Sequence, residues 1–419
     1  MPTIQRFTLL AVATLFVVAS GCDSVSDAPA ASAGGTPAAD AVQVDYSLLD
    51  AETTERLSKG EFSDAELEAR GMAPQGAVFT MSDAADGNVL YGYLRDRQGR
   101  LSLAGTFPTG GAGSGDGLNG TSNPIALALG NRYVYAVNGG SDEISAFRIN
   151  PGQRTLDFVG NIASGGPRPI SITVYERLVY VINAGRSGEP GNVKGFRIGE
   201  DGSLAAIAGS TQPLNPGAGS PSQIDFSPDG SYLVITDKPT NTITTYPVDV
   251  NGAAGARQVY PANGLTTFGF DFDFRNRLIV SEAFEGAADA SAASSYLFTE
   301  GGAPVSITAS ERTNETAACW IETFGPFAYA TNTGSGSVTG FFVRPGGELV
   351  RLNDDGITVR TGEGSMPLDM DIALNYLFVH SAGTNRISVY DIEPDGSLVS
   401  VSGAAVDGLP ETTVGVAAF

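Results

Sequence analysis

A short pattern of hydrophobic residues recurs seven times between residues 76 and 419. Each copy is a run of mostly β-branched or aromatic residues that ends in a small polar or acidic residue, as in YVYAVN at Asn138 and FAYATN at Asn332. The other copies end at Asp83, Asn183, Asp237, Glu282 and Ser381, so consecutive copies lie 45 to 55 residues apart. Hydrophobic runs of this length predict β-strands, and a regular spacing of this size indicates a repeat fold.

Each copy is accompanied by further strand-like runs that build a four-stranded unit. A second run follows it, as in EISAFRI and NVKGFRI, and a weaker third run follows most of these after a turn such as Asp201-Gly202 or Asp395-Gly396. These dipeptides predict hairpin turns, because glycine adopts positive φ without steric cost. A fourth run precedes six of the seven copies: NPIALAL, RPISITV, SPSQIDF, TTFGFDF, TAACWIE and MPLDMDI.

The two ends of the repeat region complement each other. The first unit lacks the preceding run, whereas the last residues, TTVGVAAF ending at Phe419, form a strand without a unit. We therefore expect the C-terminal strand to complete the first unit and close the chain into a ring. The predicted fold is all-β: a seven-bladed β-propeller over residues 76–419 with four strands per blade, which leaves only short, protected strand edges.

The residues before the repeats predict an export signal. Residues 1–21 carry one positive charge, Arg6, followed by an apolar run that is too short to span a membrane as a helix. The run leads through Ala19-Ser20-Gly21 into Cys22, which resembles the lipobox of bacterial lipoproteins. The resemblance implies cleavage before Cys22, a lipid on its thiol, and a location at the cell envelope, outside the cytoplasm. The alternative is an ordinary signal peptide.

The segment between this signal and the repeats divides into two parts. Residues 22–45 are rich in Ala, Ser, Pro and Gly, which predicts a flexible linker. Residues 46–75 contain helix formers and a capping-box pattern at Ser63 to Glu66, which predict one or two short helices.

Composition limits the partners and cofactors. The 419 residues contain 46 Asp and Glu against 24 Lys and Arg, for a net charge of -22. Such a surface repels phosphates, so nucleic acid is excluded as a partner. Two cysteines and one histidine cannot build zinc-finger or iron–sulfur sites. We expect a monomer without a cofactor, with Ca²⁺ as the one ion that its acidic groups could hold. With Cys22 lipidated, Cys319 is expected to be a free thiol.

The repeats resemble a known family. YVYAVN, LVYVIN and YATNTGSGSV resemble the YVTN-type propeller repeat, and SPSQIDFSPDGSYLVITDKPTNTITTY is similar to a stretch of the lactonase-like seven-bladed propellers. This family includes a 6-phosphogluconolactonase and a 3-carboxymuconate cyclase. VSEA, SSY and NETAACW, which end at Ala283, Tyr296 and Trp320, resemble a bacterial branch whose members mostly lack a defined activity. The resemblance covers nearly all of 76–419 and implies a propeller that acts on a lactone.

One departure from the family concerns its histidine. The family's enzymes carry a Pro-His pair at the start of an inner strand, where the imidazole is thought to move a proton. The matching pair here is Pro221-Ser222, and a serine hydroxyl cannot exchange a proton near pH 7. The single histidine, His380, aligns with mostly interior positions such as Val137 and Ile182. We expect it to be a buried, hydrogen-bonded side chain between blades.

Acidic residues offer a replacement for that histidine. Aligning the inner strands on their first residue places Asp225, Asp271 and Asp371 in one register, with Gln223 and Asp369 two residues earlier on the same strand face. Inner strands line the channel of a propeller, so the three aspartates are our candidate catalytic residues. Converging carboxylates raise one another's pKa or hold Ca²⁺. The alternative is that each aspartate accepts hydrogen bonds from the backbone of a neighbouring blade.

Other side chains near the inner strands are candidates for substrate binding. Arg168 and Arg275, together with Arg277, could bind a phosphate or carboxylate, or they could be solvated surface arginines. Trp320 could form the floor of a sugar site or fill the core. The full candidate set for substrate binding is Ser222, Gln223, Arg168, Arg275, Trp320 and Asp369.

Two classes of function remain open. The first is an exported, lipid-anchored enzyme that hydrolyses or isomerises a lactone or sugar-acid-like small molecule, with acids in place of the family histidine. The second is a non-catalytic propeller that has lost this histidine and binds a protein, a glycan or a small molecule at the envelope.

Overall fold

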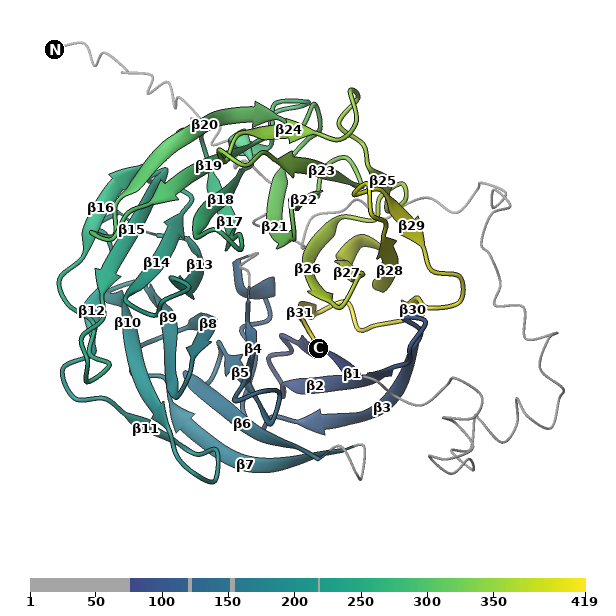
Figure 1. The fold of residues 1–419 in the computed structure, drawn as a ribbon. Coiled ribbons are helices and arrows are strands. Elements are labelled where there is room, and N and C mark those ends of the chain that lie inside the picture. Colours follow the sequence, from purple (N-terminus) through teal and green to yellow (C-terminus); the bar gives the residue numbers. More distant parts are fainter. Residues whose placement is uncertain (1–75, 120–122, 151–154, 218) are drawn as a thin grey trace, which may run out of the picture.

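Seven antiparallel sheets stand around a central channel (Figure 1). They are seen in a computed structural model that describes residues 76–119, 123–150, 155–217 and 219–419. The predicted seven-bladed β-propeller is confirmed. The predictions for the signal, linker and short helices, residues 1–75, lie outside the described residues.

The first four blades have these strands, given from the channel outward. Blade 1 contains β31 (Thr413–Ala418), β1 (Gly76–Ser82), β2 (Val89–Arg95) and β3 (Leu101–Pro108). Blade 2 contains β4 (Ile125–Ala128), β5 (Tyr133–Asn138), β6 (Glu143–Asn150) and β7 (Thr155–Ala163). Blade 3 contains β8 (Pro169–Tyr175), β9 (Leu178–Arg186), β10 (Glu189–Ile198), β11 (Leu204–Ala206) and β12 (Gln212–Pro213). Blade 4 contains β13 (Pro221–Phe226), β14 (Tyr232–Asp237), β15 (Thr242–Pro247) and β16 (Gln258–Pro261).

The remaining blades follow the same plan. Blade 5 contains β17 (Thr267–Phe272), β18 (Arg277–Glu282), β19 (Ala292–Phe298) and β20 (Pro304–Arg312). Blade 6 contains β21 (Ala318–Phe324), β22 (Phe327–Asn332), β23 (Ser337–Val343), β24 (Leu349–Arg351) and β25 (Val359–Arg360). Blade 7 contains β26 (Pro367–Ala373), β27 (Tyr376–Ser381), β28 (Arg386–Ile392), β29 (Leu398–Ser400) and β30 (Val406–Asp407). Among the described residues, short 3₁₀ turns occur at Gly117–Asn119 (η2), Phe284–Gly286 (η3) and Ala382–Thr384 (η4).

The C-terminal strand closes the ring, as the sequence predicted. β31 pairs with β1 from Val78 opposite Ala418 to Ser82 opposite Thr413. Beyond the strand, the Phe419 N–H donates to the Ala77 carbonyl at 3.0 Å. The first blade therefore combines both ends of the repeat region, and β31 covers the inner edge of β1.

Tyrosines in the repeated phrase connect several blades to the next one. The hydroxyl of Tyr135 in blade 2 donates to the Gly202 carbonyl of blade 3 at 2.9 Å. Tyr180 in blade 3 donates in the same way to Gly252 of blade 4 at 2.7 Å. These rings are buried, so each fills the space between two sheets and also satisfies a turn carbonyl.

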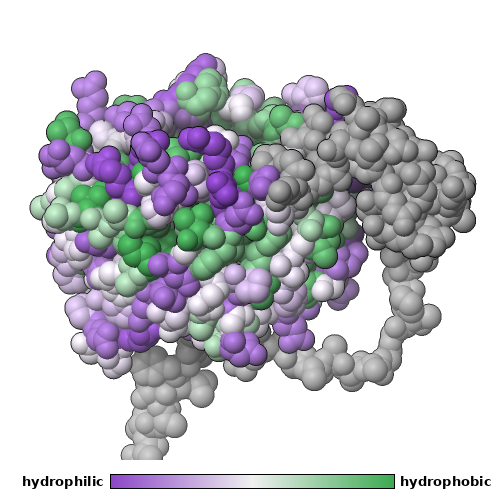
Figure 2. All heavy atoms as spheres, turned by 90° about the horizontal axis from the view of Figure 1, so that it is seen from below, coloured by the Kyte–Doolittle hydropathy of each residue, from purple (hydrophilic) through white to green (hydrophobic). Residues whose placement is uncertain are grey.

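The rim of the disc is mixed in polarity. Figure 2 shows hydrophobic side chains mainly around the middle of this side, with hydrophilic ones more frequent towards the two faces. Exposed large hydrophobic residues of the two outer strands of the blades include Leu103, Phe158, Leu297, Val305 and Val399. No helix among the described residues has the length and apolar character needed to cross a membrane.

Candidate functional site

A cavity of about 330 Å³ occupies the channel, and all seven inner strands line it. Its titratable lining residues are four carboxylic acids, Asp225, Asp271, Glu322 and Asp371. Neutral polar side chains, among them Thr173 and Gln223, also line it.

The four acids form half of a ring. Each is paired with a residue three positions before the end of the repeated phrase: Asp225 with Val234, Asp271 with Ile279, Glu322 with Tyr329 and Asp371 with Phe378. The four therefore share one register in blades 4 to 7, and we call them the acid half-ring. Blades 2 and 3 carry Ala126 and Thr173 at this register, opposite Tyr135 and Tyr180. The three aspartates thus lie where the sequence predicted, in one register of the channel.

The sequence prediction missed Glu322. Aligning TAACWIE on its first residue places Ile321 in the register of the aspartates. In the structure, Ala318 pairs with Asn332 and Thr267 pairs with Glu282, each at the end of its repeated phrase. Ala318 is the third residue of TAACWIE, whereas Thr267 is the second residue of TTFGFDF. The strand β21 therefore begins one residue later than the alignment assumed. Aligning on the end of the paired phrase, rather than on the start of the inner run, would have identified Glu322.

The aspartates also link neighbouring blades. The Thr323 backbone N–H and hydroxyl of blade 6 donate to Asp271 Oδ2 at 2.8 and 2.7 Å. The Ala418 N–H of blade 1 donates to Asp371 Oδ2 at 2.7 Å, and the Thr173 hydroxyl of blade 3 donates to Asp225 Oδ1. The interblade backbone hydrogen bonds expected under the alternative interpretation are therefore present for Asp271 and Asp371, whereas Asp225 accepts from a side chain. These bonds hold the carboxyl groups at the cavity wall.

Glu322 differs from the three aspartates. Its carboxyl group has no hydrogen-bond partner in the part of the chain that the structure describes. Burial raises its pKa well above the usual value, and the charges of Asp271, Asp371, Asp369 and Asp225 raise it further. Burial and these charges therefore both favour the protonated form of Glu322.

The pKa values of two of the aspartates lie close to neutrality. Burial, with a further contribution from the Asp271 charge, raises the pKa of Asp225 to about 6 and that of Asp371 to about 7. Burial also raises the pKa of Asp271. All four side chains nevertheless keep some exposure to the cavity. At neutral pH the half-ring thus holds both ionised and protonated carboxyl groups, which is the condition for acid–base chemistry.

Asp369 and His380 form a second buried group beside the half-ring. They lie opposite each other on β26 and β27, and each is 1% exposed. Asp369 Oδ2 and both ring nitrogens of His380 have no hydrogen-bond partner among the described residues. Burial raises the pKa of Asp369 well above its usual value and lowers that of His380 to about 4. His380 is therefore neutral at pH 7.

The expectation of a hydrogen-bonded His380 is wrong. At the aligned position of blade 5, the short hydroxyl of Ser281 donates to the Gly269 carbonyl at 3.1 Å. The larger imidazole of His380 occupies this position without reaching an acceptor among the described residues.

Gln223 and Ser222 have different environments. Gln223 lines the cavity and bonds Phe270 of the next blade twice, because its Nε2 donates to the Phe270 carbonyl at 2.8 Å and its Oε1 accepts the Phe270 N–H at 2.9 Å. Ser222 is buried, does not line the cavity, and donates to the Thr267 carbonyl at 3.3 Å. The serine that replaces the family's histidine thus faces backbone.

The three candidate arginines lie away from the acid half-ring. Arg168 pairs with Asp116. Arg275 donates to the Pro345 carbonyl at 3.0 Å, and the buried Arg277 pairs with Asp273. None of the three arginines lines the channel cavity. The prediction that Arg168 and Arg275 bind substrate beside the acids therefore finds no support in the geometry.

Trp320 also lies away from the cavity lining. Its indole is 3% exposed and packs on Phe268 with ring centroids 5.0 Å apart. Of the two roles that the sequence left open, this environment fits that of a core residue.

Cys319 does not offer a free thiol to the channel. It is buried and disulfide-bonded, so the expectation of a free thiol is wrong. The chain has one other cysteine, Cys22, which lies outside the described residues. Among the described residues, no group of three or more His, Cys, Asp and Glu side chains is arranged to hold a metal ion.

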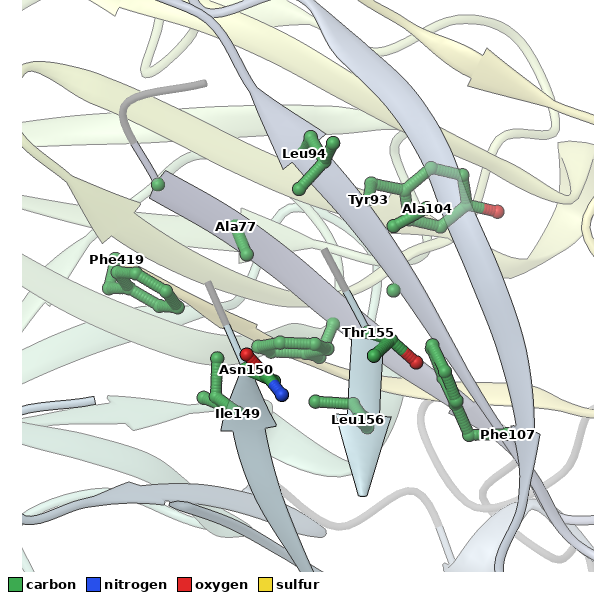
Figure 3. Close-up of a pocket in the computed structure, with 13 residues that line it drawn as sticks. Ala77, Tyr93, Leu94, Ala104, Phe107, Ile149, Asn150, Thr155, Leu156 and Phe419 are labelled. Atoms are coloured by element: carbon green, nitrogen blue, oxygen red, sulfur yellow. The ribbon is translucent and has the colours of Figure 1, made fainter. Parts of the chain in front are cut away.

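A second pocket, of about 260 Å³, lies between blades 1 and 2 (Figure 3). Its lining is mainly apolar and includes Ala77, Phe107, Ile149, Leu156 and Phe419. No aspartate, glutamate, lysine, arginine or histidine side chain lines it, so its side chains offer no acid–base pair near neutral pH.

Comparisons with known proteins agree with this architecture. A family model described as "Lactonase, 7-bladed beta-propeller" matches residues 85–205, from the end of β1 through blade 2 into blade 3. A sequence comparison with curated proteins gives no match.

Several solved structures share the fold. A candidate 6-phosphogluconolactonase from Bacteroides fragilis has 18% identity and a TM-score of 0.60, over 82% of this chain and 98% of that one. A protein from Lactobacillus plantarum has 20% identity and a TM-score of 0.64, over 83% and 99%. The periplasmic gluconolactonase of Pseudomonas aeruginosa has 15% identity and a TM-score of 0.58, over 80% and 100%. At these identities the likeness shows the fold. The resemblance to lactonase-like propellers noted in the repeats is thus confirmed.

Proposed function

We propose that this lactonase-like propeller is an exported, lipid-anchored enzyme that hydrolyses a lactone of a sugar acid or of a related small molecule. The observation that carries the proposal is the acid half-ring. It places four carboxyl groups around one cavity of about 330 Å³, and two of them have pKa values of about 6 and 7.

The chemistry assigns different roles to carboxyl groups of different charge. An ionised aspartate, Asp225 or Asp371, takes a proton from water while the water oxygen attacks the lactone carbonyl carbon. Protonated Glu322 donates a hydrogen bond to the developing oxyanion and then gives its proton to the ring oxygen as the C–O bond breaks. One water is consumed and one hydroxy acid is formed. Transfer of the proton from the aspartate back to Glu322 restores both groups.

The comparisons support the reaction class. The family model is that of a lactonase, and the Pseudomonas aeruginosa neighbour is a gluconolactonase of the periplasm. The alternative, a binding propeller without catalysis, is favoured by the environment of Ser222, which bonds a backbone carbonyl where the family's enzymes carry histidine.

The direct test is a pH-stat assay of the purified protein with glucono-1,5-lactone, its 6-phosphate, a muconolactone and an acyl-homoserine lactone, with and without Ca²⁺. The base must be ionised, so we expect kcat/KM to rise with pH through the interval of about 6 to 7 set by the pKa values of Asp225 and Asp371. Absence of turnover on every lactone between pH 5 and 9 would favour the binding propeller.

The proposed lipid anchor has its own test. Cys22 is the one cysteine of the chain besides Cys319. A disulfide between these two would use the Cys22 sulfur that the lipid needs, so the lipid anchor and that disulfide exclude each other. Mass spectrometry of the N-terminal peptide, from membranes of cells that express the full chain, is expected to show a diacylglycerol-modified Cys22 as residue one. An unmodified peptide, or one linked to Cys319 by a reducible bond, would contradict the anchor.

A further inference from the structure

Among the described residues, the channel cavity has no positive charge to balance its acids. No lysine, arginine or histidine of this part of the chain contributes to its lining. The side chain of Arg275, on the turn after β17, donates to the Pro345 carbonyl, and that of Arg277 pairs with Asp273. Clustered carboxyl groups without a counter-charge oppose one another's ionisation, and a cation from outside would relieve this opposition.

A fifth carboxyl group strengthens this conclusion. Asp369 lies two residues before Asp371 on β26 and therefore on the same face of the strand. It is 1% exposed and does not itself line the cavity. Its Oδ2 makes no hydrogen bond among the described residues, although the nearby backbone N–H groups of Val416 and Asn123 favour its ionised form. Its charge acts on Glu322 of the neighbouring blade, so it lies within electrostatic reach of the half-ring. A cation in the cavity would further stabilise the ionised form of Asp369.

We propose that the ligand of this cavity carries a protonated amine, as an amino sugar or an amino-substituted lactone does. The inference rests on the proposed function and names the substrate class of the same site. An ammonium group supplies both the missing positive charge and three hydrogen-bond donors. The cavity volume of about 330 Å³ lies in the range that suits small molecules. A phosphate or carboxylate on the ligand adds negative charge to an acidic wall and opposes binding.

The arrangement of the acids favours an amine over a metal ion. The aspartates belong to different blades, and their oxygens already accept hydrogen bonds, as Asp271 Oδ2 does from both donors of Thr323. Ca²⁺ needs six to eight oxygen ligands at about 2.3–2.6 Å. No group of three or more acidic, histidine or cysteine side chains in the described residues has such an arrangement.

Binding of an amine has a proton signature. Four strands supply the titratable groups that face the cavity: Asp225 from β13, Asp271 from β17, Glu322 from β21 and Asp371 from β26. Asp369 lies beside them. The described lining residues of β4, β8 and β31 include no titratable side chain. A bound cation favours the ionised carboxylates, so it lowers their pKa values and expels protons near neutral pH.

The test compares three sugars that share one ring: D-glucosamine, D-glucose and D-glucose 6-phosphate. Calorimetric titration of the full-length protein at pH 6.5, in two buffers with different heats of ionisation, gives both affinity and proton release. We expect glucosamine to bind at least about tenfold more tightly than glucose, consistent with one charge-assisted interaction of about 1.4 kcal/mol or more. It should release protons, and glucose 6-phosphate should not bind. Asp369→Asn should reduce the affinity for glucosamine, whereas the exposed Asp355→Asn should not.

The outcomes separate the inference from the proposed function. Binding of glucose or glucose 6-phosphate as tight as that of glucosamine overturns the inference, as does binding without proton release. Competition of Ca²⁺ with glucosamine at equal or lower concentration also overturns it, in favour of a metal site. Hydrolysis of gluconolactone without glucosamine binding overturns the inference and leaves the proposed function intact. Glucosamine binding without hydrolysis of any lactone, the lactone of glucosaminic acid included, supports the inference and contradicts the proposed function.

Discussion

The substitution Glu322→Gln is expected to slow lactone hydrolysis by about 10²–10⁴-fold, the usual contribution of a general acid. The glutamine side chain keeps nearly the shape of glutamate but cannot transfer a proton to the leaving oxygen. Glu322 lines the cavity and makes no hydrogen bond among the described residues. The substitution therefore removes the acid without breaking a contact that holds the blades together, and the fold should persist.

The rate at saturating lactone, together with the thermal midpoint of unfolding, checks this expectation. Glu348→Gln is a matched control, because Glu348 is exposed on the rim and the substitution is chemically the same. The control should keep the wild-type rate, and both variants should melt within a few degrees of the wild type. A rate for Glu322→Gln within about twofold of the wild-type rate would remove Glu322 from the mechanism.

A chain that ends at Glu411 is expected not to fold. This truncation removes β31, the innermost strand of blade 1, in which every residue is buried. Val414 and Val416 each lose burial of roughly 1.5–3 kcal/mol, and blade 1 loses its hydrogen bonds between β31 and β1. Asp371 also loses the Ala418 N–H donor. Total stabilities of about 5–15 kcal/mol leave little margin for losses of this size.

Circular dichroism and thermal unfolding of the truncated chain provide the measurement. We expect no cooperative transition at a concentration at which the full chain melts sharply. A synthetic peptide of residues 412–419 should restore the transition in trans, whereas a scrambled peptide should not. A truncated chain that melts cooperatively near the wild-type midpoint would show that the ring does not depend on β31.

The fold was predictable because its information is local and repeated. Each blade carries its own hydrophobic phrase and turn glycines, so a weak signal at one blade is reinforced by the others. The closure by β31 followed from the strand count alone, since the first unit lacked one strand and the chain's last residues supplied one. The pairing of Val78 with Ala418 bears this out.

The site was predictable only in part. Asp225, Asp271 and Asp371 were placed in one register, but Glu322 was missed through a one-residue shift. The bulge between Ala318 and Ile321 has its counterpart between Thr267 and Phe270 in blade 5, so the shift comes from the point at which β21 begins to pair. A hydrophobic run does not reveal that point. Each such shift changes which side chain faces the channel.

The contacts made by the ends of long side chains could not be predicted from the sequence either. Arg275 lies near an inner strand in sequence, yet its guanidinium reaches the Pro345 carbonyl of the next blade and stays outside the channel. Burial of His380 agreed with its alignment to interior positions, whereas its lack of hydrogen bonds depended on the distance to acceptors in another blade. Sequence periodicity predicts from which face of the strand a side chain projects. It does not predict which atoms the end of a long side chain contacts.

Closure by β31 also fixes the order in which the ring can form. The innermost place in the first blade is filled by Thr413–Ala418, so a chain synthesised only as far as blade 7 cannot complete its ring. Until β31 is available, the inner edge of β1 stays unpaired, and the neighbouring face of blade 7 lacks its covering strand. Any product that stops short of Thr413 therefore keeps an unpaired strand edge that chaperones or proteases can recognise.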